Sequence, residues 1–149
     1  MKHSNRWLAA SMLAVSLQLT ACQQRSSDAH QADHPVEVEA IKGLNGNRVT
    51  MTERAIERIA LKTDKVREQQ VSRPPSPRRV VPHSALIYDP KGETWVYTSP
   101  QPRTFIKHKV DVAYVERGWA VLNDGPPTGT VVVSSATVEV YGADSGVGH

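Results

Sequence analysis

The only cysteine of this 149-residue chain, Cys22, ends the run Leu19-Thr20-Ala21-Cys22 and supplies the chain's single thiol nucleophile. A basic start with Lys2 and Arg6 comes first, followed by an apolar stretch over residues 7–17 and then by small residues. This order is typical of a secretory signal. The apolar stretch is about half of the ~20 residues that a membrane-spanning helix needs, so it predicts a signal rather than a transmembrane helix.

The Leu-Thr-Ala-Cys ending resembles the lipobox of bacterial lipoproteins. The resemblance implies that residues 1–21 are a signal peptide and that Cys22 is acylated and becomes the first mature residue. A thiol is the nucleophile that accepts the lipid, and small residues before it let a peptidase bind the chain. Two or more acyl chains give lasting membrane attachment. The alternative is an ordinary cleaved signal with a chance cysteine.

Residues 22–35 are polar and predict a flexible tether, because they cannot bury enough apolar surface to fold. His30 and His34 are four residues apart in this tether, with Asp28 and Asp33 beside them. Imidazole and carboxylate groups can bind a divalent ion. A flexible tether holds ligands poorly, so we expect solvated side chains and no metal site here. Periplasmic metal binding is the alternative.

Three other residues, His83, Ser84 and His108, are candidates for catalysis or metal binding. His83 and Ser84 are adjacent in an expected strand, where neighbouring side chains point to opposite faces, so we do not expect a catalytic pair. His108 shares an apolar strand face with Ile106 and Val110, which favours a hydrogen-bonded or partly exposed histidine over a ligand. No catalytic triad, paired carboxylates, phosphate-binding glycine loop or zinc spacing occurs. We expect no enzymatic activity and no cofactor.

The composition gives no reason to expect a nucleic-acid partner, and it indicates which half of the chain builds the core. Removing residues 1–21 takes away Lys2 and Arg6 and leaves 16 basic against 15 acidic residues, which gives no reason to expect nucleic acid as a partner. An acylated Cys22 cannot form a disulfide, so packing must stabilise the fold. Aromatic residues bury the most area, and all but Trp7 lie at Tyr88 or later, so the C-terminal half should build the main core.

The elements before residue 72 are short. Alternation predicts strands over 36–40 and 48–51 and an extended segment over 61–71. Thr50 and Glu53 have the spacing of a capping box, which predicts one short helix with Ile56, Ile59 and Ala60 on one face. Residues 72–79 contain three prolines in four residues and favour a loop or edge crossing between two halves of one domain. A basic, proline-rich ligand for a partner is the alternative.

From residue 80 onward the sequence alternates strands and turns. We expect strands over 80–88, 93–98, 104–115, 119–122 and 130–134. Asp89-Pro90-Lys91-Gly92 favours a type I turn, and Glu116-Arg117-Gly118 a tight reversal. Several short strands at this spacing predict a mainly β fold over 36–149, a small antiparallel barrel or sandwich with one short helix.

Three strand motifs occur in a particular order: Val81-Pro82-His83-Ser84-Ala85-Leu86, Thr94-Trp95-Val96-Tyr97 and Gly129-Thr130-Val131-Val132-Val133. In this order they resemble the C-terminal region of the periplasmic adaptor subunits, or membrane fusion proteins, of resistance-nodulation-division efflux pumps. Residues 139–149 look like adaptors of the heavy-metal branch. Residues 48–66 resemble the segment that opens the same region. The resemblance covers about two-thirds of the chain.

The departures from the family pattern are informative. Full-length adaptors place a lipoyl-like domain, a long α-helical hairpin and a β-barrel between the two segments, whereas this chain has only the proline-rich joint. In the family those segments meet in the membrane-proximal domain, beside the inner-membrane transporter. The resemblance therefore implies a truncated, lipid-anchored module that associates with such a transporter or with full-length adaptors. Thr130 replaces a usual aspartate and Ala136 a frequent glycine, which puts the local turn geometry in question.

The expected location is the bacterial cell envelope, on the periplasmic side. Gln23 follows Cys22, and in enteric-like sorting the absence of aspartate there favours the outer membrane. Pump adaptors sit on the inner membrane, which we favour slightly. The sequence is also compatible with a structural envelope lipoprotein and with a non-functional relic of an adaptor gene.

Overall fold

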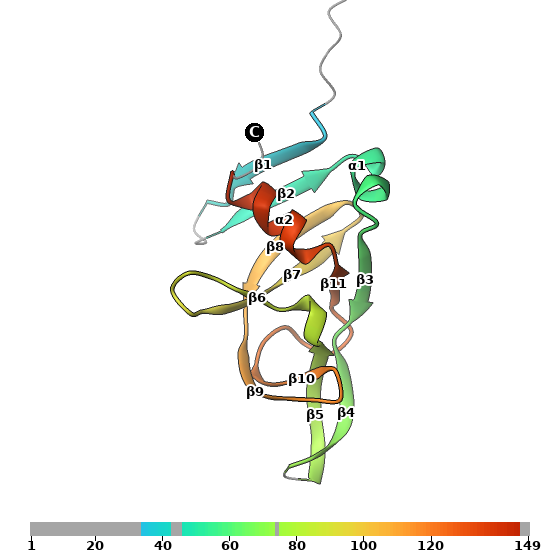
Figure 1. Ribbon diagram of the computed structural model, residues 1–149, viewed down its shortest axis with the longest axis vertical. Coiled ribbons are helices and arrows are strands. Elements are labelled where there is room, and N and C mark those ends of the chain that lie inside the picture. Colours follow the sequence, from blue (N-terminus) through green and yellow to red (C-terminus); the bar gives the residue numbers. More distant parts are fainter. Residues whose placement is uncertain (1–33, 43–45, 74, 147–149) are drawn as a thin grey trace, which may run out of the picture. The chain divides into compact units, whose positions relative to one another are not determined.

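Strands dominate the structure, a computed structural model that describes residues 34–42, 46–73 and 75–146 (Figure 1). Contacts group the chain from His34 onward into one compact unit. All strand pairings in it are antiparallel, and the strands form two sheets. The predicted mainly β fold is confirmed. A barrel or a sandwich was expected. The two sheets are arranged like a sandwich and do not close into a barrel.

The first sheet has the strand order β1-β2-β8-β7-β11-β3, with β6 paired to β7. Its strands are Val36–Ala40 (β1), Asn47–Met51 (β2), Lys62–Lys65 (β3), Ile87–Tyr88 (β6), Thr94–Gln101 (β7), Thr104–Lys109 (β8) and Val131–Ser135 (β11). The second sheet has the order β4-β5-β10-β9. Its strands are Arg67–Ser72 (β4), Pro75–Pro82 (β5), Asp111–Glu116 (β9) and Trp119–Asp124 (β10). The helices are Glu53–Arg58 (α1), the 3-10 turn His83–Ala85 (η1) and Thr137–Asp144 (α2).

In the first sheet, the strands that follow the proline-rich segment (β8, β7 and β11) lie between strands that precede it, with β1 and β2 on one side and β3 on the other. β2 pairs with β8 through Val49 and Phe105, among others. β3 pairs with β11, with Lys65 opposite Val131. The second sheet joins β4 to β5 in the same way. Neither half of the chain therefore completes a sheet by itself.

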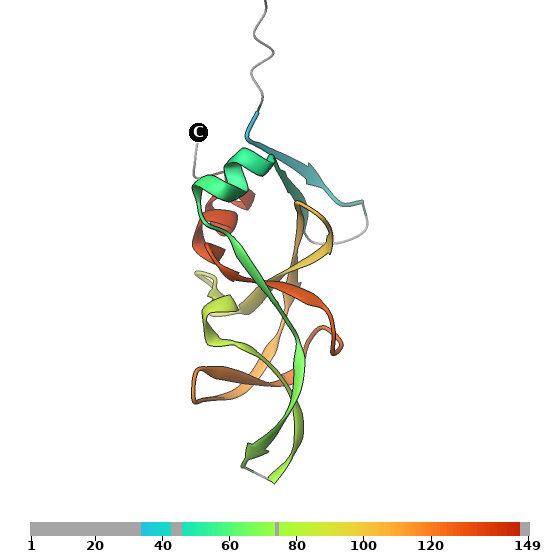
Figure 2. The same ribbon diagram turned by 90° about the vertical axis from the view of Figure 1, so that its right-hand side faces the viewer.

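Of the loop or edge crossing expected over 72–79, the loop is wrong, because Ser72 ends β4 and residues 75–79 belong to β5. β4 and β5 form a hairpin in which Ser72 lies opposite Pro75 and Gln70 opposite Pro77. β10 pairs with β5 only from Val80 onward, so the prolines lie where one edge of β5 has no neighbouring strand. Proline is tolerated at such an edge because its missing N–H is not needed there. Figures 1 and 2 place this hairpin at the opposite end of the unit from β1, α1 and α2.

The expected single strand over 104–115 is two strands in different sheets. β8 ends at Lys109, and β9 begins at Asp111. Between them Val110 is buried, and its N–H donates to the Thr94 carbonyl at 2.9 Å. The alternation of side chains continues through this residue, so the sequence pattern did not reveal the change of sheet.

Three smaller expectations also need correction. The N-cap of α1 is Thr52, whose Oγ1 accepts a hydrogen bond from the Ala55 N–H at 3.2 Å, and not Thr50. Ala60 lies outside the helix, exposed and with φ of 50°, rather than on its apolar face. The expected strand 80–88 is interrupted by η1, because β5 ends at Pro82.

Both expected turns are present. The Gly92 N–H donates to the Asp89 carbonyl at 2.9 Å, which closes the turn between β6 and β7. Arg117 and Gly118 have φ of 50° and 83° and reverse the chain between β9 and β10. Two residues of positive φ match the twist of a two-residue hairpin.

The centre of the first sheet is buried on both faces, whereas its outer strands β1 and β3 are mostly exposed. Val132 and Val96 face a cluster shared with the second sheet, which also contains Val66, Val81, Ala85, Leu86, Val110, Ala120 and Leu122. Their neighbours Val133 and Tyr97 point the other way, because adjacent strand side chains alternate. That second cluster also contains Val49, Met51, Ile87, Phe105 and Val140 of α2. A smaller cluster of Val71, Val80 and Val121 lies within the second sheet.

Candidate docking surface

The predicted lipidation residue and most of the possible tether ligands lie outside the described residues. These are Cys22, Asp28, His30 and Asp33. His34 is described and is exposed. Within the described residues, no group of three or more histidine, cysteine, aspartate or glutamate side chains is arranged to hold a metal ion. The described part of the chain also has no helix long and apolar enough to cross a membrane.

His83 and Ser84 are adjacent in η1 and not in a strand, and Ser84 makes hydrogen bonds that join elements of the fold. The Ser84 hydroxyl donates to the Ser134 carbonyl at 2.7 Å, and its own carbonyl accepts from the Thr137 hydroxyl at 3.1 Å. These bonds join η1 to β11 and to the start of α2. His83 is exposed. His108 lies on β8 opposite Val96 and is also exposed.

A polar network holds α2 against the first sheet. The buried Tyr97 hydroxyl donates to Asp144 Oδ2 at 2.7 Å, and Asn47 Nδ2 donates to Asp144 Oδ1 at 2.9 Å. Burial raises the pKa of Tyr97 far above its usual value, and the bond to the Asp144 carboxylate raises it further. Tyr97 therefore stays protonated and acts as a donor, not as an acid or base.

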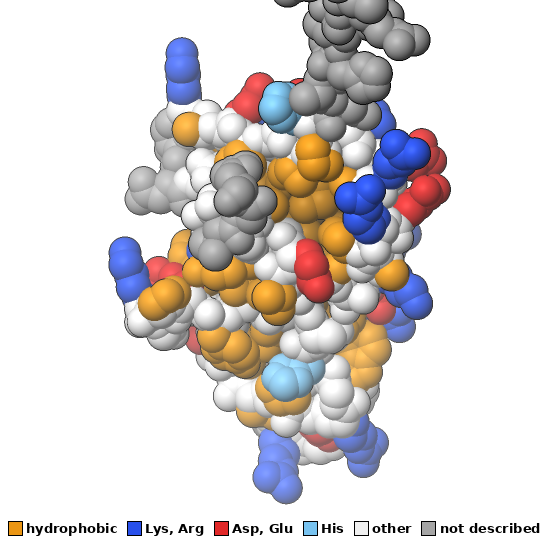
Figure 3. All heavy atoms as spheres, turned by 45° about the horizontal axis from the view of Figure 1, so that its top comes forward, with side chains coloured by type: hydrophobic (Ala, Val, Ile, Leu, Met, Phe, Trp, Pro, Cys, Tyr) orange, Lys and Arg blue, Asp and Glu red, His pale blue; other side chains and the backbone are white. Residues whose placement is uncertain are grey.

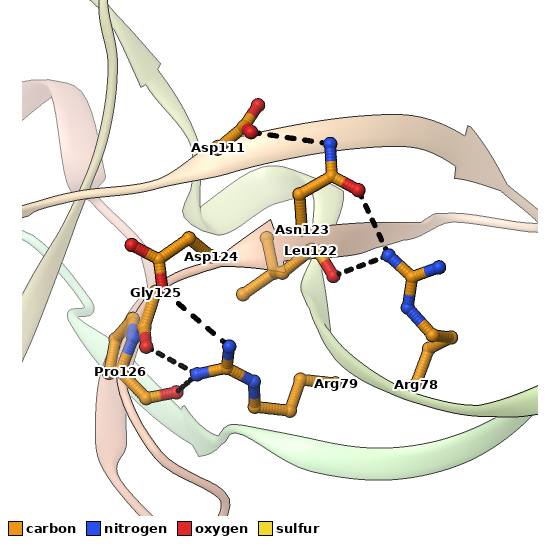
Figure 4. A network of polar contacts seen from close by, with 8 residues as sticks. All are labelled: Arg78, Arg79, Asp111, Leu122, Asn123, Asp124, Gly125 and Pro126. Atoms are coloured by element: carbon orange, nitrogen blue, oxygen red, sulfur yellow. Dashed lines mark hydrogen bonds and ion pairs between the residues drawn. The ribbon is translucent and has the colours of Figure 1, made fainter.

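A second network fixes the loop after β10 (Figure 4). Arg79 donates to the carbonyls of Gly125 and Pro126 and lies 3.7 Å from the Asp124 carboxylate. Arg78 donates to the Leu122 carbonyl and to Asn123 Oδ1, both at 3.0 Å. The Arg79 guanidinium thus binds this loop, the Arg78 guanidinium binds the end of β10, and Arg73 at the tip of the hairpin is exposed.

An open groove of about 690 Å³ lies where β3 leads into β4. It is lined by Thr63, Asp64, Lys65, Val66, Arg67, Glu68, Thr128, Gly129 and Val131. Asp64 accepts from Arg67 at 2.6 Å, and this bond holds the pKa of the Asp64 carboxyl below its usual value. The charges of the groove are paired or alternate in sign.

Hydrophobic side chains gather on the face formed by β1, α1 and α2 (Figure 3). Seven of them pack on the second core cluster and remain partly exposed: Val36, Ala55, Ile56, Ile59, Leu61, Tyr141 and Ala143. Val138 of α2 is 68% exposed. We call this set the helical face. Apolar surface gathered in one place and rimmed by polar residues is typical of a contact with another molecule.

A lysine held between two aromatic rings borders the helical face. The Lys107 ammonium lies 4.4 Å from the centre of the Trp95 ring and 5.1 Å from that of Tyr141. The Trp95 indole N–H donates to Asp89 Oδ2 at 3.0 Å, which fixes the ring. Sequence reasoning missed this arrangement. It depends on the β7–β8 register, which sets Tyr97 opposite Lys107, and on α2, which no sequence pattern predicted.

The segments that resemble adaptor subunits lie together in the structure. Residues 48–66 form β2, α1 and β3, and residues 129–133 lead into β11. β11 lies between β3 and β7, which carries Thr94-Trp95-Val96-Tyr97. At the two departures, the Thr130 carbonyl accepts from the Val66 N–H at 2.8 Å, and Ala136 has φ of 62°. The strand β11 forms despite both changes.

Neither protein-family models nor curated protein sequences give a match to this chain when compared with it. The adaptor resemblance therefore remains a prediction from the motifs, and the function built on it is a proposal.

Proposed function

We propose that this chain is a lipid-anchored, non-enzymatic accessory module that associates with an efflux transporter of the cell envelope. In this proposal it is a shortened adaptor that keeps the membrane-proximal region only. It is held to the periplasmic side of the membrane by Cys22 and contacts an inner-membrane transporter or full-length adaptor subunits.

The observation that carries the proposal is the pairing of the two adaptor-like segments. The segment before the joint supplies β2 and β3, and these strands pair with β8 and β11 from the segment after it. A joint between unrelated pieces would give no reason for such pairing. A deletion between pieces that already met in a parent domain accounts for it directly.

The secondary structure of the described residues limits what such a module can do. α1 and α2 contain six and eight residues, so neither can act as the long hairpin with which adaptors reach an outer-membrane channel. At about 1.5 Å per residue, the longer one spans roughly 12 Å. The helical face remains available for a lateral contact. We therefore propose a role as a cap or modulator beside the transporter.

The test is crosslinking in intact cells of the native host, with the tagged full chain expressed at its natural level. We expect a transporter of the resistance-nodulation-division type, or a full-length adaptor, among the crosslinked proteins. A Cys22→Ser variant is the matched control and should lose the contact, because it lacks the lipid. Mass spectrometry of the mature N-terminus checks acylation of Cys22 separately.

Absence of both partners from the crosslinked material would remove the proposal. Two further measurements separate it from the competing functions. A structural envelope lipoprotein predicts that deletion leaves metal and drug tolerance unchanged. A metal-binding lipoprotein predicts saturable uptake of zinc or copper by the purified chain, with loss in a His30→Ala, His34→Ala double variant.

A further inference from the structure

Lys107 is a partly buried cation whose ammonium contacts two aromatic faces. It lies over Trp95 and Tyr141, and no carboxylate among the described residues lies within ion-pair distance of it. The face of an aromatic ring attracts a cation electrostatically. A carboxylate is a stronger partner, and removing an ammonium from water favours acquiring one.

The neighbouring carboxylates are already used. Asp89 accepts from the N–H groups of Lys91 and Glu93 and from the Trp95 indole. Partial desolvation opposes its ionisation, but these bonds and the field of Lys107 together hold the pKa of Asp89 below its usual value. Glu93 is paired with Lys109. Lys107 thus interacts electrostatically with Asp89 at a distance, but no carboxylate among the described residues contacts its ammonium group.

The surroundings of Lys107 restrict what can bind there. Tyr141 leads along α2 to Val138, whose side chain is 68% exposed. A partner whose anionic group binds Lys107 would therefore also contact α2, where an apolar group of the partner could pack on Val138. Glu139 is exposed on the same helix, Asp89 accepts from the Trp95 indole, and Glu93 is paired with Lys109. These carboxylates would be pressed against the headgroups of an anionic lipid surface, so the patch fits a protein better.

We propose that Lys107, Trp95, Tyr141 and Val138 form the docking point for an acidic side chain of the protein partner, with an adjacent apolar side chain packed on Val138. We call these four residues the lysine bracket. This inference rests on the proposed function, since it names the surface and chemistry of the same contact. Loss of one member of such an interfacial charge pair leaves the other without its partner and weakens the complex.

The experiment places a photo-crosslinking amino acid at Val138 of the full-length, lipid-anchored chain in its native membrane. Yield to the transporter or adaptor is then compared for Lys107→Glu, Lys107→Arg and the unchanged residue. We expect Lys107→Glu to lower the yield tenfold or more and Lys107→Arg to keep most of it, because arginine also binds carboxylate and stacks on aromatic rings. Lys65→Glu, on the exposed strand β3, is the matched control and should change nothing.

Failure of this inference is distinguishable from failure of the proposed function. If Lys107→Glu still crosslinks at the original yield, the lysine bracket is not the docking point, although the pump association stands. If the chain with Lys107 unchanged crosslinks to neither partner, whether from Val138 or with a general crosslinker, both the docking point and the proposed pump association are wrong. A thermal melt of each variant shows that it is folded, and Lys107→Gln replaces Lys107→Glu where the latter is not. Preferential, Lys107-dependent binding of the Cys22→Ser chain to phosphatidylglycerol vesicles would overturn the protein partner in favour of lipid.

Discussion

Ala136 adopts the left-handed backbone conformation, with φ of 62° and ψ of 27°, directly before α2. This conformation costs a residue with a Cβ about 1–2 kcal/mol. Glycine avoids that cost but loses about 0.5–1 kcal/mol more in chain entropy. Ala136→Gly should therefore raise the free energy of unfolding by about 0.5–1 kcal/mol, measured by urea denaturation. Ala113→Gly in the extended strand β9 is the control and should lower it. A destabilised Ala136→Gly variant would show that the strain is absent.

Two tyrosines differ in whether the hydroxyl has a partner. The Tyr97 hydroxyl donates to Asp144, whereas the buried Tyr114 hydroxyl has no partner among the described residues. Tyr97→Phe should lower the free energy of unfolding by about 1.5–3 kcal/mol, because a bond to a charged group is lost. Tyr114→Phe should leave it unchanged or raise it by about 1 kcal/mol, because desolvation of the hydroxyl is avoided. Urea denaturation of the two variants measures both changes, and equal losses would contradict this assignment.

Acid should weaken the turn at Asp89. Because the pKa of this carboxyl is lower in the folded than in the unfolded chain, its contribution to stability is present above about pH 4 and disappears as the pH falls through the folded pKa. Asp89→Asn should lower the melting temperature at pH 7, because the Trp95 indole loses its acceptor. The difference from the original chain should shrink below pH 4. A difference that stays constant down to pH 2 would exclude this linkage.

At the scale of the elements, period-two alternation predicted β1, and a run of β-branched residues predicted β11, whose Val132 and Val133 are buried on opposite faces. β1, β2 and β11 lie within a residue of the expected positions. The pattern failed where two sheets continue the same alternation, as at Val110, and where prolines occupy an unpaired strand edge, as in β5. α2 was not predicted because its β-branched residues Thr137, Val138 and Val140 are unusual in a helix. Without α2, the sequence could not place Tyr141 over Lys107.

The β4–β5 hairpin also positions a loop at a distance in sequence. Arg79 binds the carbonyls of Gly125 and Pro126, so Arg79→Met should release residues 123–129. Because the Arg79 side chain is 32% exposed, we expect a loss of only about 1 kcal/mol, together with faster hydrogen exchange in that loop. Arg73→Met, at the exposed tip of the hairpin, is the control and should alter neither. Unchanged exchange in Arg79→Met would mean that the loop is held by its own backbone.

For the whole molecule, the consequence of the interleaved topology is that the halves should not fold separately. A fragment of residues 75–149 lacks β1 to β4, so the buried Phe105 loses its cross-strand partner Val49, and β11 loses β3. Such a fragment exposes much of the second core cluster, and its strands acquire unpaired edges.

We therefore expect residues 75–149 alone to show no cooperative urea transition, and residues 34–73 alone to show none. Mixing the two should restore a transition, because every strand pairing of the described residues can still form. A chain cut instead between residues 102 and 103, between the adjacent strands β7 and β8, is the control. Its two fragments also share the first sheet, so we expect that neither folds alone and that mixing them restores a transition. If 75–149 alone unfolds at the same urea concentration as the intact chain, the upstream segment contributes no stability. The pairing that supports an adaptor origin would then be incidental.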